Sequence, residues 1–180
     1  MLLKKLFTDF CSMSLHECFI LLGSNMGDRS LLLEEARMQI AKKAGKILQS
    51  SGIYETAAWG KESQPSFLNQ VLVIGTSLHP EPLMQTLLSI EVEMGRIREE
   101  KMGPRTIDID ILFYDELVHN SETLIVPHPL LQLRRFVLLP LSEINPSKMH
   151  PLLKQTIEHL LANCNDPLTV EKTESFIHNH

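Results

Sequence analysis

The stretch KMGPRTIDIDIL, residues 101–112, contains the strongest structural pattern in the chain. Apolar and acidic residues alternate within it. This predicts a β-strand over residues 106–114, because successive side chains of a strand point to opposite faces. The side chains predicted to face the core are those of Ile107, Ile109 and Ile111. Asp108 and Asp110 then share the other face, with Cα atoms about 6.5 Å apart at roughly 3.3 Å per residue.

Two carboxylates side by side on a strand repel each other, and aspartate is uncommon in strands. A divalent cation removes both objections, since Mg²⁺ favours one or two carboxylates completed by water and substrate phosphates. The alternative is a half-exposed strand with solvated aspartates, which is commonplace on the open face of a sheet. An Asp-x-Asp pair taken alone favours this alternative, so the choice depends on the neighbouring residues.

A polar, basic loop with glycine near both ends leads into this strand. Its cationic residues are Arg96, Arg98, Lys101 and Arg105. Phosphoryl transfer needs metal ions that bridge phosphate oxygens and guanidinium groups that hold the charge moving to the leaving group. In the simpler alternative, the loop is solvated and its charges pair with Glu99 and Glu100. The loop and the aspartates together predict an Mg²⁺-dependent enzyme that transfers phosphoryl groups from ATP.

The segments on either side of this strand predict an α+β domain. Further strands are expected at residues 18–22, 46–54 and 67–78, and helices at residues 30–44 and 80–94. A loop is expected at 55–65, a hairpin-like excursion at 117–126, and helical segments within 127–140 and 151–162. The order predicts a ferredoxin-like βαββαβ core with added strands and C-terminal helices, arranged as three α/β/α layers.

The composition is that of an ordinary globular protein, with 180 residues, 43% hydrophobic, and a net charge of −5. This acidic balance argues against nonspecific binding to nucleic acid or membrane surfaces, although a local arginine cluster can still bind a small anion. No apolar stretch is long enough to span a membrane. The three cysteines, Cys11, Cys18 and Cys164, form no CxxC pair, which is typical of packing or surface thiols in a reducing cytoplasm.

The segment KMGPRTIDIDIL resembles the signature of the 6-hydroxymethyl-7,8-dihydropterin pyrophosphokinase family, which acts in folate biosynthesis. The positions that match this signature are Lys101, Gly103, Pro104, Arg105, Asp108 and Asp110. Three other blocks are similar to the family: GSN at 23–25, YETAAWG to QPSFLNQV within 54–71, and VPHPLLQLRRFVLLPLSEI at 126–144. Together the blocks span residues 18–144, which is nearly the whole predicted domain.

The resemblance implies transfer of the pyrophosphoryl group of ATP to the hydroxymethyl oxygen of the dihydropterin, leaving AMP. It implies these catalytic residues: Arg96, Arg105, Asp108 and Asp110. The two aspartates would hold two Mg²⁺ ions along the triphosphate. The residues expected to contact ATP are Glu91, Arg98, Ile111, His128 and Arg134. The residues expected to bind the pterin are Thr56, Trp59, Gly60, Phe67, Asn69 and Phe136.

The pterin assignments have a physical basis beside the resemblance. A flat heterocycle stacks between aromatic rings, here Phe67 and Phe136, and an amide such as Asn69 can match a ring edge that carries donors and acceptors. Each residue also has a simpler interpretation. Phe67 could belong to the core, Asn69 could be a polar strand position, and His128 could be a structural turn residue. Met102 stands where well-known members carry tryptophan, which leaves the nucleotide contacts less defined than the metal pair.

We expect a poorly ordered extension at residues 1–16, a single pyrophosphokinase domain at 17–163 and a C-terminal tail at 164–180. The protein is expected to be a cytoplasmic monomer whose partners are ATP and 6-hydroxymethyl-7,8-dihydropterin. A polymerase- or nuclease-like enzyme is the second hypothesis, and the acidic charge argues against it. A noncatalytic metal- or nucleotide-binding module is the third, and it leaves the convergence of aromatic, amide, arginine and aspartate positions unexplained.

Overall fold

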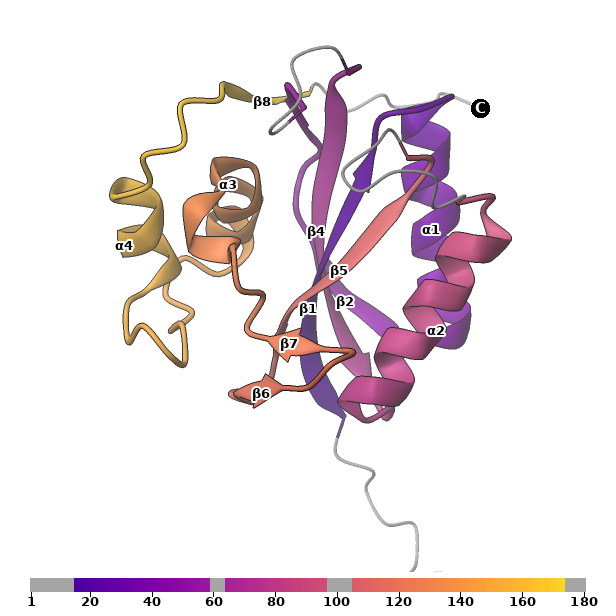
Figure 1. Cartoon of the computed structure of the whole chain (residues 1–180), viewed down its shortest axis with the longest axis horizontal. Coiled ribbons are helices and arrows are strands. Elements are labelled where there is room, and N and C mark those ends of the chain that lie inside the picture. The colour runs from indigo at the N-terminus through magenta and orange to yellow at the C-terminus, as the bar shows by residue number, and fades with distance from the viewer. Residues whose placement is uncertain (1–14, 59–63, 97–104, 174–180) are drawn as a thin grey trace, which may run out of the picture.

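The computed structural model describes residues 15–58, 64–96 and 105–173. Within these ranges, a six-stranded antiparallel sheet forms the middle of the molecule (Figure 1). The strands are β1 (His16–Ser24), β2 (Lys46–Ser50), β3 (Tyr54–Thr56), β4 (Phe67–Thr76), β5 (Asp108–Tyr114) and β8 (Val170–Lys172). Their order is β5-β1-β4-β3-β8, and β2 also pairs with β4.

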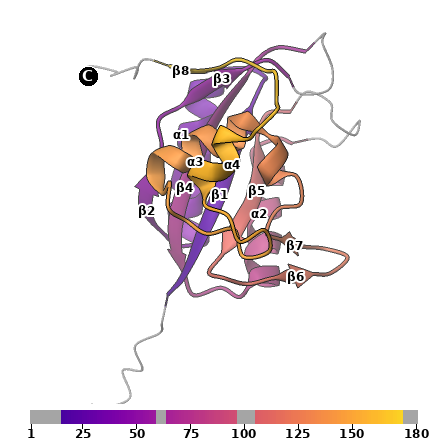
Figure 2. The same cartoon turned by 90° about the vertical axis from the view of Figure 1, so that its left-hand side faces the viewer.

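Helices cover both faces of this sheet, as Figures 1 and 2 show. One face carries α1 (Arg29–Lys43) and α2 (Pro80–Glu93), and the other carries α3 (Arg135–Ile144) and α4 (Ile157–Ala162). A small hairpin of β6 (His119–Asn120) and β7 (Ile125–Val126) and the 3₁₀ turn η1 (Leu131–Leu133) lie between β5 and α3. The predicted α+β fold with a ferredoxin-like order of elements and three layers is therefore confirmed.

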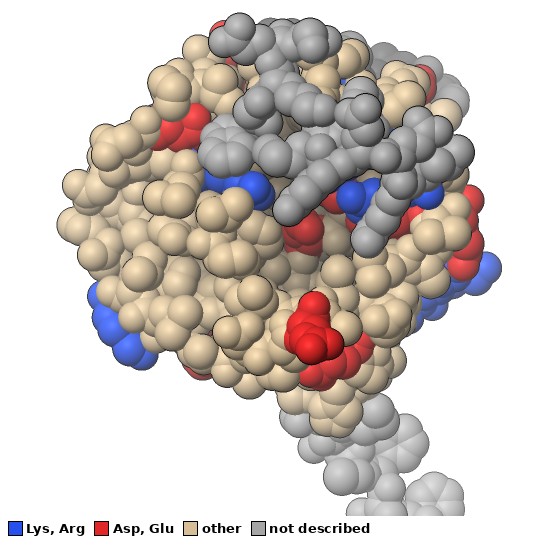
Figure 3. Space-filling model, in the orientation of Figure 1, with Lys and Arg blue, Asp and Glu red and all other residues tan. Residues whose placement is uncertain are grey.

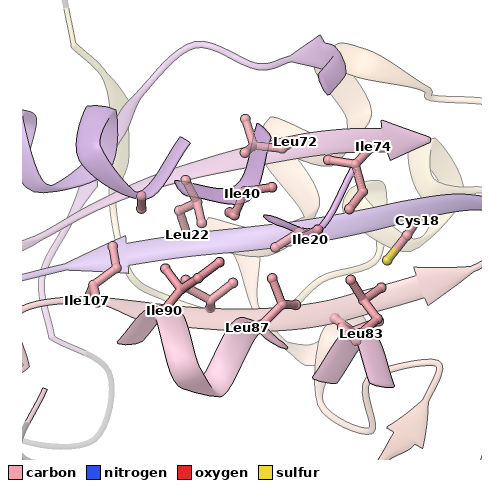
Figure 4. Close-up of a cluster of buried hydrophobic side chains, with 14 of the residues drawn as sticks. Cys18, Ile20, Leu22, Ile40, Leu72, Ile74, Leu83, Leu87, Ile90 and Ile107 are labelled. Atoms are coloured by element: carbon pink, nitrogen blue, oxygen red, sulfur yellow. The ribbon is translucent and has the colours of Figure 1, made fainter. Parts of the chain in front are cut away.

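The first hydrophobic core lies between the sheet and the pair α1 and α2 (Figure 4). Helix α2 presents Leu83, Leu87 and Ile90, whose spacing puts them on one side of a helix. The strand residues that face them include Cys18, Ile20, Leu22, Leu72, Ile74, Ile109 and Ile111, together with Ile107 just before β5. The predicted inward orientation of the three isoleucines is thus confirmed.

The second hydrophobic core lies on the opposite face, under α3 and α4. Its strand residues include Phe19, Leu21, Val71, Val73, Leu112 and Phe113, and its helix residues include Val137, Leu138, Leu141, Ile157 and Leu160. Strand β1 is buried on both faces, which explains why it appears in the sequence as an unbroken apolar run.

A β-bulge interrupts the pairing of β5 with β1. Phe19 pairs with Phe113, but the next residue, Ile20, pairs with Ile111, so Leu112 is an extra residue on β5. As a result, Leu112 and Phe113 both pack in the second core. The alternation predicted from the sequence therefore holds only as far as Ile111.

The strand predicted at residues 46–54 is divided into β2 and β3. Between them, residues 51–53 face only residues 70 and 71 of β4, because Ser50 pairs with Leu72 and Tyr54 with Asn69. The backbone and side chain of Ser51 bind β4 at this break. Strand β3 continues to Thr56, so the prediction of a loop from residue 55 is wrong for its first two residues.

The C-terminal helices and strand differ in extent from the prediction. Helix α3 begins at Arg135, after the short η1 turn, and α4 begins only at Ile157. Strand β8 was not predicted, and it pairs with β3, which lies more than a hundred positions earlier in the chain. Cys18 and Cys164 are free, buried thiols, as expected for packing residues. Of the helices in the described ranges, none has the length and apolarity to cross a bilayer.

Glu143 of α3 fastens β3 and β8 together. Its carboxylate accepts hydrogen bonds from Tyr54 Oη at 2.7 Å, from Gly52 N at 3.1 Å and from Lys172 Nζ at 2.7 Å. Burial alone would raise the pKa of Glu143, but these donors outweigh burial and lower it. Glu143 thus joins one helix and two strands through a charged group.

Replacing Glu143 by glutamine should reveal this charge as a pH-dependent contribution to stability. A carboxylate whose folded-state pKa lies below its ordinary 4.5 stabilises the fold above that pH, and the contribution is lost as the pH falls through the folded-state pKa. We expect Glu143→Gln to lower the free energy of unfolding by about 1–2 kcal/mol at neutral pH. Urea denaturation should show this difference shrinking in acid. Glu158→Gln, on the exposed side of α4, is the control, and a pH-independent difference for Glu143→Gln would contradict the interpretation.

Candidate functional site

Three adjacent strands, β5, β1 and β4, bring polar residues into one row at the end of the sheet where β1 terminates. Asn69 of β4 and Asp108 of β5 both pair with Gly23 of β1. Directly paired residues point to the same face of a sheet, so Asn69 and Asp108 flank Gly23 on one face. A Cβ atom on Gly23 would lie 3.3 Å from Asn69 Oδ1 and 3.9 Å from Asp108 Cβ. Glycine therefore keeps the space between the amide and the carboxylate open.

Arginines converge on Asp108 from two segments. Arg96 Nη1 lies 2.8 Å from Asp108 Oδ1, and Arg105 Nη1 donates to Asp108 Oδ2 at 2.6 Å. Three of the four residues predicted to be catalytic are therefore in direct contact. The fourth, Asp110, lies two positions farther along the same strand and interacts electrostatically with Asp108 and Arg105.

The charge on Asp110 is disfavoured by its surroundings. Burial, followed by the negative charges of Asp108 and Glu91, raises the pKa of Asp110 to about 7 despite the opposing charges of Arg134 and Arg105. A cation beside both aspartates would relieve this repulsion. Within the described part of the chain, His, Cys, Asp and Glu side chains form no metal-binding cluster of three or more. The aspartate pair thus offers two protein ligands, a number that suits Mg²⁺ completed by water and phosphates.

Glu91 connects the end of α2 to β5. It is 2% exposed, it forms an ion pair with Arg96, and it accepts a hydrogen bond from Ile109 N at 2.8 Å. Burial raises the pKa of Glu91, whereas the charges of Asp108 and Glu91 outweigh burial and raise the pKa of Arg96. The sequence predicted Glu91 as an ATP contact, and in this structure Glu91 contacts Arg96 and the β5 backbone.

His128 and Arg134 approach the aspartates from the segment before α3. His128 N donates to Leu112 O at 3.0 Å, and His128 Nδ1 accepts a hydrogen bond from Leu130 N at 3.2 Å. Burial and the nearby Arg134 lower the pKa of His128 to about 4, so the ring is neutral at physiological pH and carries its proton on Nε2. The Arg134 guanidinium lies 5.7 Å from the centre of the Phe136 ring.

Four of the six residues assigned to the pterin occupy β3, β4 and the start of α3. Asn69 is 2% exposed, and its Nδ2 donates to Thr56 Oγ1 at 3.2 Å. The Phe67 ring lies 5.8 Å from the Arg105 guanidinium, which links this group to the charged residues. Phe67 and Phe136 are both half-buried, as expected for rings that keep one face accessible.

The other predicted residues are Ile111, Trp59, Gly60 and Arg98. The Ile111 side chain packs in the first core and not in the site, so only its backbone could meet a nucleotide. Trp59, Gly60 and Arg98 lie outside the described residues. Figure 3 shows acidic atoms between two basic groups in the upper half of one face.

Sequence reasoning missed the roles of Gly23 and Asn25. Both lie in the GSN block that matched the family, but their contacts depend on strand pairing. Asn25 is 1% exposed and exchanges hydrogen bonds with the backbone of Arg105. The available signal was a small residue and an amide at the end of a buried strand, close to the expected metal site.

Comparison with known proteins identifies relatives of this chain. The family model for 7,8-dihydro-6-hydroxymethylpterin-pyrophosphokinase (HPPK) matches residues 19–146. A 2-amino-4-hydroxy-6-hydroxymethyldihydropteridine pyrophosphokinase of Methylorubrum extorquens is 40% identical over 154 residues, which cover 85% of this chain and 96% of that protein. The Bacillus subtilis protein of the same name is 46% identical over 127 residues, covering 70% of this chain and 76% of its own length.

Some relatives are much longer than this chain. It is 43% identical to the folic acid synthesis protein fol1 of Pneumocystis carinii over 134 residues, which are 74% of this chain but only 18% of that protein. A crystal structure of wild-type Plasmodium falciparum HPPK-DHPS superposes with a TM-score of 0.68 at 19% identity, covering 82% of this chain and 43% of the other. This structural likeness supports the fold. The family match and the identities to full-length relatives establish that the chain belongs to the 7,8-dihydro-6-hydroxymethylpterin-pyrophosphokinase family.

Proposed function

We propose that this protein transfers the pyrophosphoryl group of ATP to the hydroxymethyl oxygen of 6-hydroxymethyl-7,8-dihydropterin, releasing AMP, as a step of folate biosynthesis. The single observation that carries the proposal is the row Asn69–Gly23–Asp108. It sets an amide suited to a heterocycle beside a carboxylate suited to a metal–nucleotide complex. The names of the Methylorubrum and Bacillus relatives support the same reaction.

Asp108 and Asp110 would hold the Mg²⁺ ions that accompany ATP. Ions held by these two carboxylates would supply positive charge that offsets the negative charge of the phosphates. The raised pKa of Asp110 reflects a carboxylate charge that a cation would stabilise. The two aspartates would hold the ions at the end of β5, on the same side of the sheet as Asn69 and Phe67.

Arg96, Arg105 and Arg134 would bind the triphosphate. In the present structure Arg96 and Arg105 are paired with Asp108. Phosphate oxygens are negatively charged like the Asp108 carboxylate, so they can bind the same planar guanidinium groups. An exchange of partners would free Asp108 for the metal and hold the negative charge that moves to AMP. Neutral His128 can donate its Nε2 proton to a phosphate oxygen without carrying charge itself.

Asn69, Thr56 and Phe67 would bind the pterin, with Phe136 on the other face of the ring. The Asn69 amide is held by Thr56, so its direction is fixed before the substrate arrives. Phe67 is two residues from Asn69 on β4 and therefore points to the same face. An aromatic ring and a fixed amide together select a flat heterocycle with polar edges.

We further infer that the protein is a cytoplasmic monomer, that its partners are the two small substrates, and that residues 17–163 form the catalytic domain. The free thiols of Cys18 and Cys164 suit a reducing compartment. The pairing of β8 with β3 places part of the predicted tail, residues 170–172, on the same sheet.

Replacing Asp110 by asparagine should abolish turnover while the protein stays folded. The substitution keeps the size of the side chain but removes a negatively charged ligand from the metal site, so we expect a loss of about a hundredfold or more in kcat. The measurement is a coupled assay of AMP release that requires both Mg²⁺ and the hydroxymethyl-dihydropterin. Asp115→Asn, just beyond the other end of β5, is the matched control. Full activity of Asp110→Asn would refute the metal role, and AMP release without the dihydropterin would refute the reaction.

Replacing Gly23 by alanine should impair pterin binding more than ATP binding. The new methyl group would press on Asn69 Oδ1 at 3.3 Å and come within 3.7 Å of the Phe67 ring. We expect the KM for the dihydropterin to rise about tenfold, with a change of at most about twofold for ATP. Gly75→Ala is the control, because the atoms nearest to a Cβ there belong to Leu15 and Leu48 and lie at ordinary contact distances. Equal changes in both KM values would contradict the assignment of this space to the pterin.

A further inference from the structure

A single buried amide, that of Asn25, is bonded to segments on both sides of the site. Asn25 follows directly after β1 and is 1% exposed. Its Oδ1 accepts from Arg105 N at 2.8 Å, and its backbone N donates to Arg105 O at 3.3 Å. Its Nδ2 donates to Gln64 Oε1 at 3.3 Å and to Pro65 O at 3.4 Å. The donor end and the acceptor end of one carboxamide therefore serve different segments.

The bonds to Arg105 determine where its guanidinium can reach. With both its N–H and its carbonyl bound to Asn25, the backbone of Arg105 is fixed beside the end of β1. From this position the side chain donates to Asp108 at 2.6 Å and lies over the Phe67 ring. A shift of the Arg105 backbone would move a positive charge away from the place proposed for the triphosphate.

The bonds to Gln64 and Pro65 fix the chain just before Phe67. The next residue, Ser66, is held independently, because Arg29 Nη1 donates to both Ser66 O and Ser66 Oγ at 2.9 Å. The start of β4 is thus held from two directions, by Asn25 and by the first residue of α1. This double attachment limits how the Phe67 ring can tilt.

We propose that Asn25 is a positioning residue that sets Arg105 for the triphosphate and the approach to Phe67 for the pterin with the same carboxamide. This inference rests on the proposed function. An asparagine is required because the site needs one acceptor and a two-proton donor in a short side chain. Aspartate would retain the acceptor for Arg105 N but would face Gln64 Oε1 and Pro65 O with a second acceptor.

Three variants separate the role of Asn25 Oδ1, which binds Arg105, from that of Nδ2, which binds Gln64 and Pro65. Asn25→Ala removes the side-chain bonds to Arg105 and those to Gln64 and Pro65, so the KM values for ATP and for the dihydropterin should each rise about tenfold. Asn25→Asp retains the acceptor for Arg105 N, so the KM for the dihydropterin should rise about tenfold and that for ATP at most about twofold. Gln64→Ala removes the acceptor of one Asn25 Nδ2 bond without changing the buried Asn25, and should raise only the KM for the dihydropterin.

Steady-state kinetics with both substrates varied, together with thermal melting, test this proposal. Asn163→Ala is the matched control, since Asn163 Nδ2 donates to His159 O at 2.8 Å in α4, and this variant should change the melting temperature without changing either KM. The proposal is overturned if active Asn25→Asp and Gln64→Ala keep wild-type KM values, or if Asn25→Ala changes only the melting temperature. If the wild-type protein shows no dihydropterin-dependent release of AMP, the proposed function itself is refuted.

Discussion

The pairing of β1 with β4 on one edge and β5 on the other is the constraint on which the rest of the structure depends. Strand β1 contributes to both hydrophobic cores, so its side chains leave no free face and its position is fixed by burial on two sides. Because the three strands are in register, Gly23 at the end of β1 lies between Asn69 and Asp108. The site therefore owes its geometry to paired strands, which are more rigid than the loops that often carry binding residues.

The charges of the site are organised before any ligand binds. Glu91, Arg96, Asp108 and Arg105 form a continuous chain of contacts from α2 to β5, in which acidic and basic groups alternate. Burying such a network is costly unless each charge has a partner. A metal–nucleotide complex brings both signs of charge, so it can replace these internal pairs without leaving a buried charge alone. The pKa of Asp110 is raised, so an incoming cation would stabilise its charged form.

Local patterns in the sequence predicted what local physics determines. The alternation at residues 107–111 gave the correct faces for the isoleucines and aspartates, and the helix that became α2 was placed within one residue. Features that depend on distant partners were missed. The bulge at Leu112 follows from pairing with β1, and β8 exists because β3 offers it an edge. The packing of Gly23 and the bonds of Asn25 likewise require a register that no single segment reveals.

The bulge in β5 separates two demands on one strand. On one side of it, Asp108 and Asp110 must stay level with Gly23 and Leu21 of β1. On the other side, Phe113 must meet Phe19 edge to face in the second core. The additional residue, Leu112, accommodates the change of register between the two parts of β5. The part with the aspartates can keep its alignment with β1 while the part with Phe113 packs against α3 and α4. Sequence change in the C-terminal layer can thus be accommodated by this protein without carrying the acidic pair out of place.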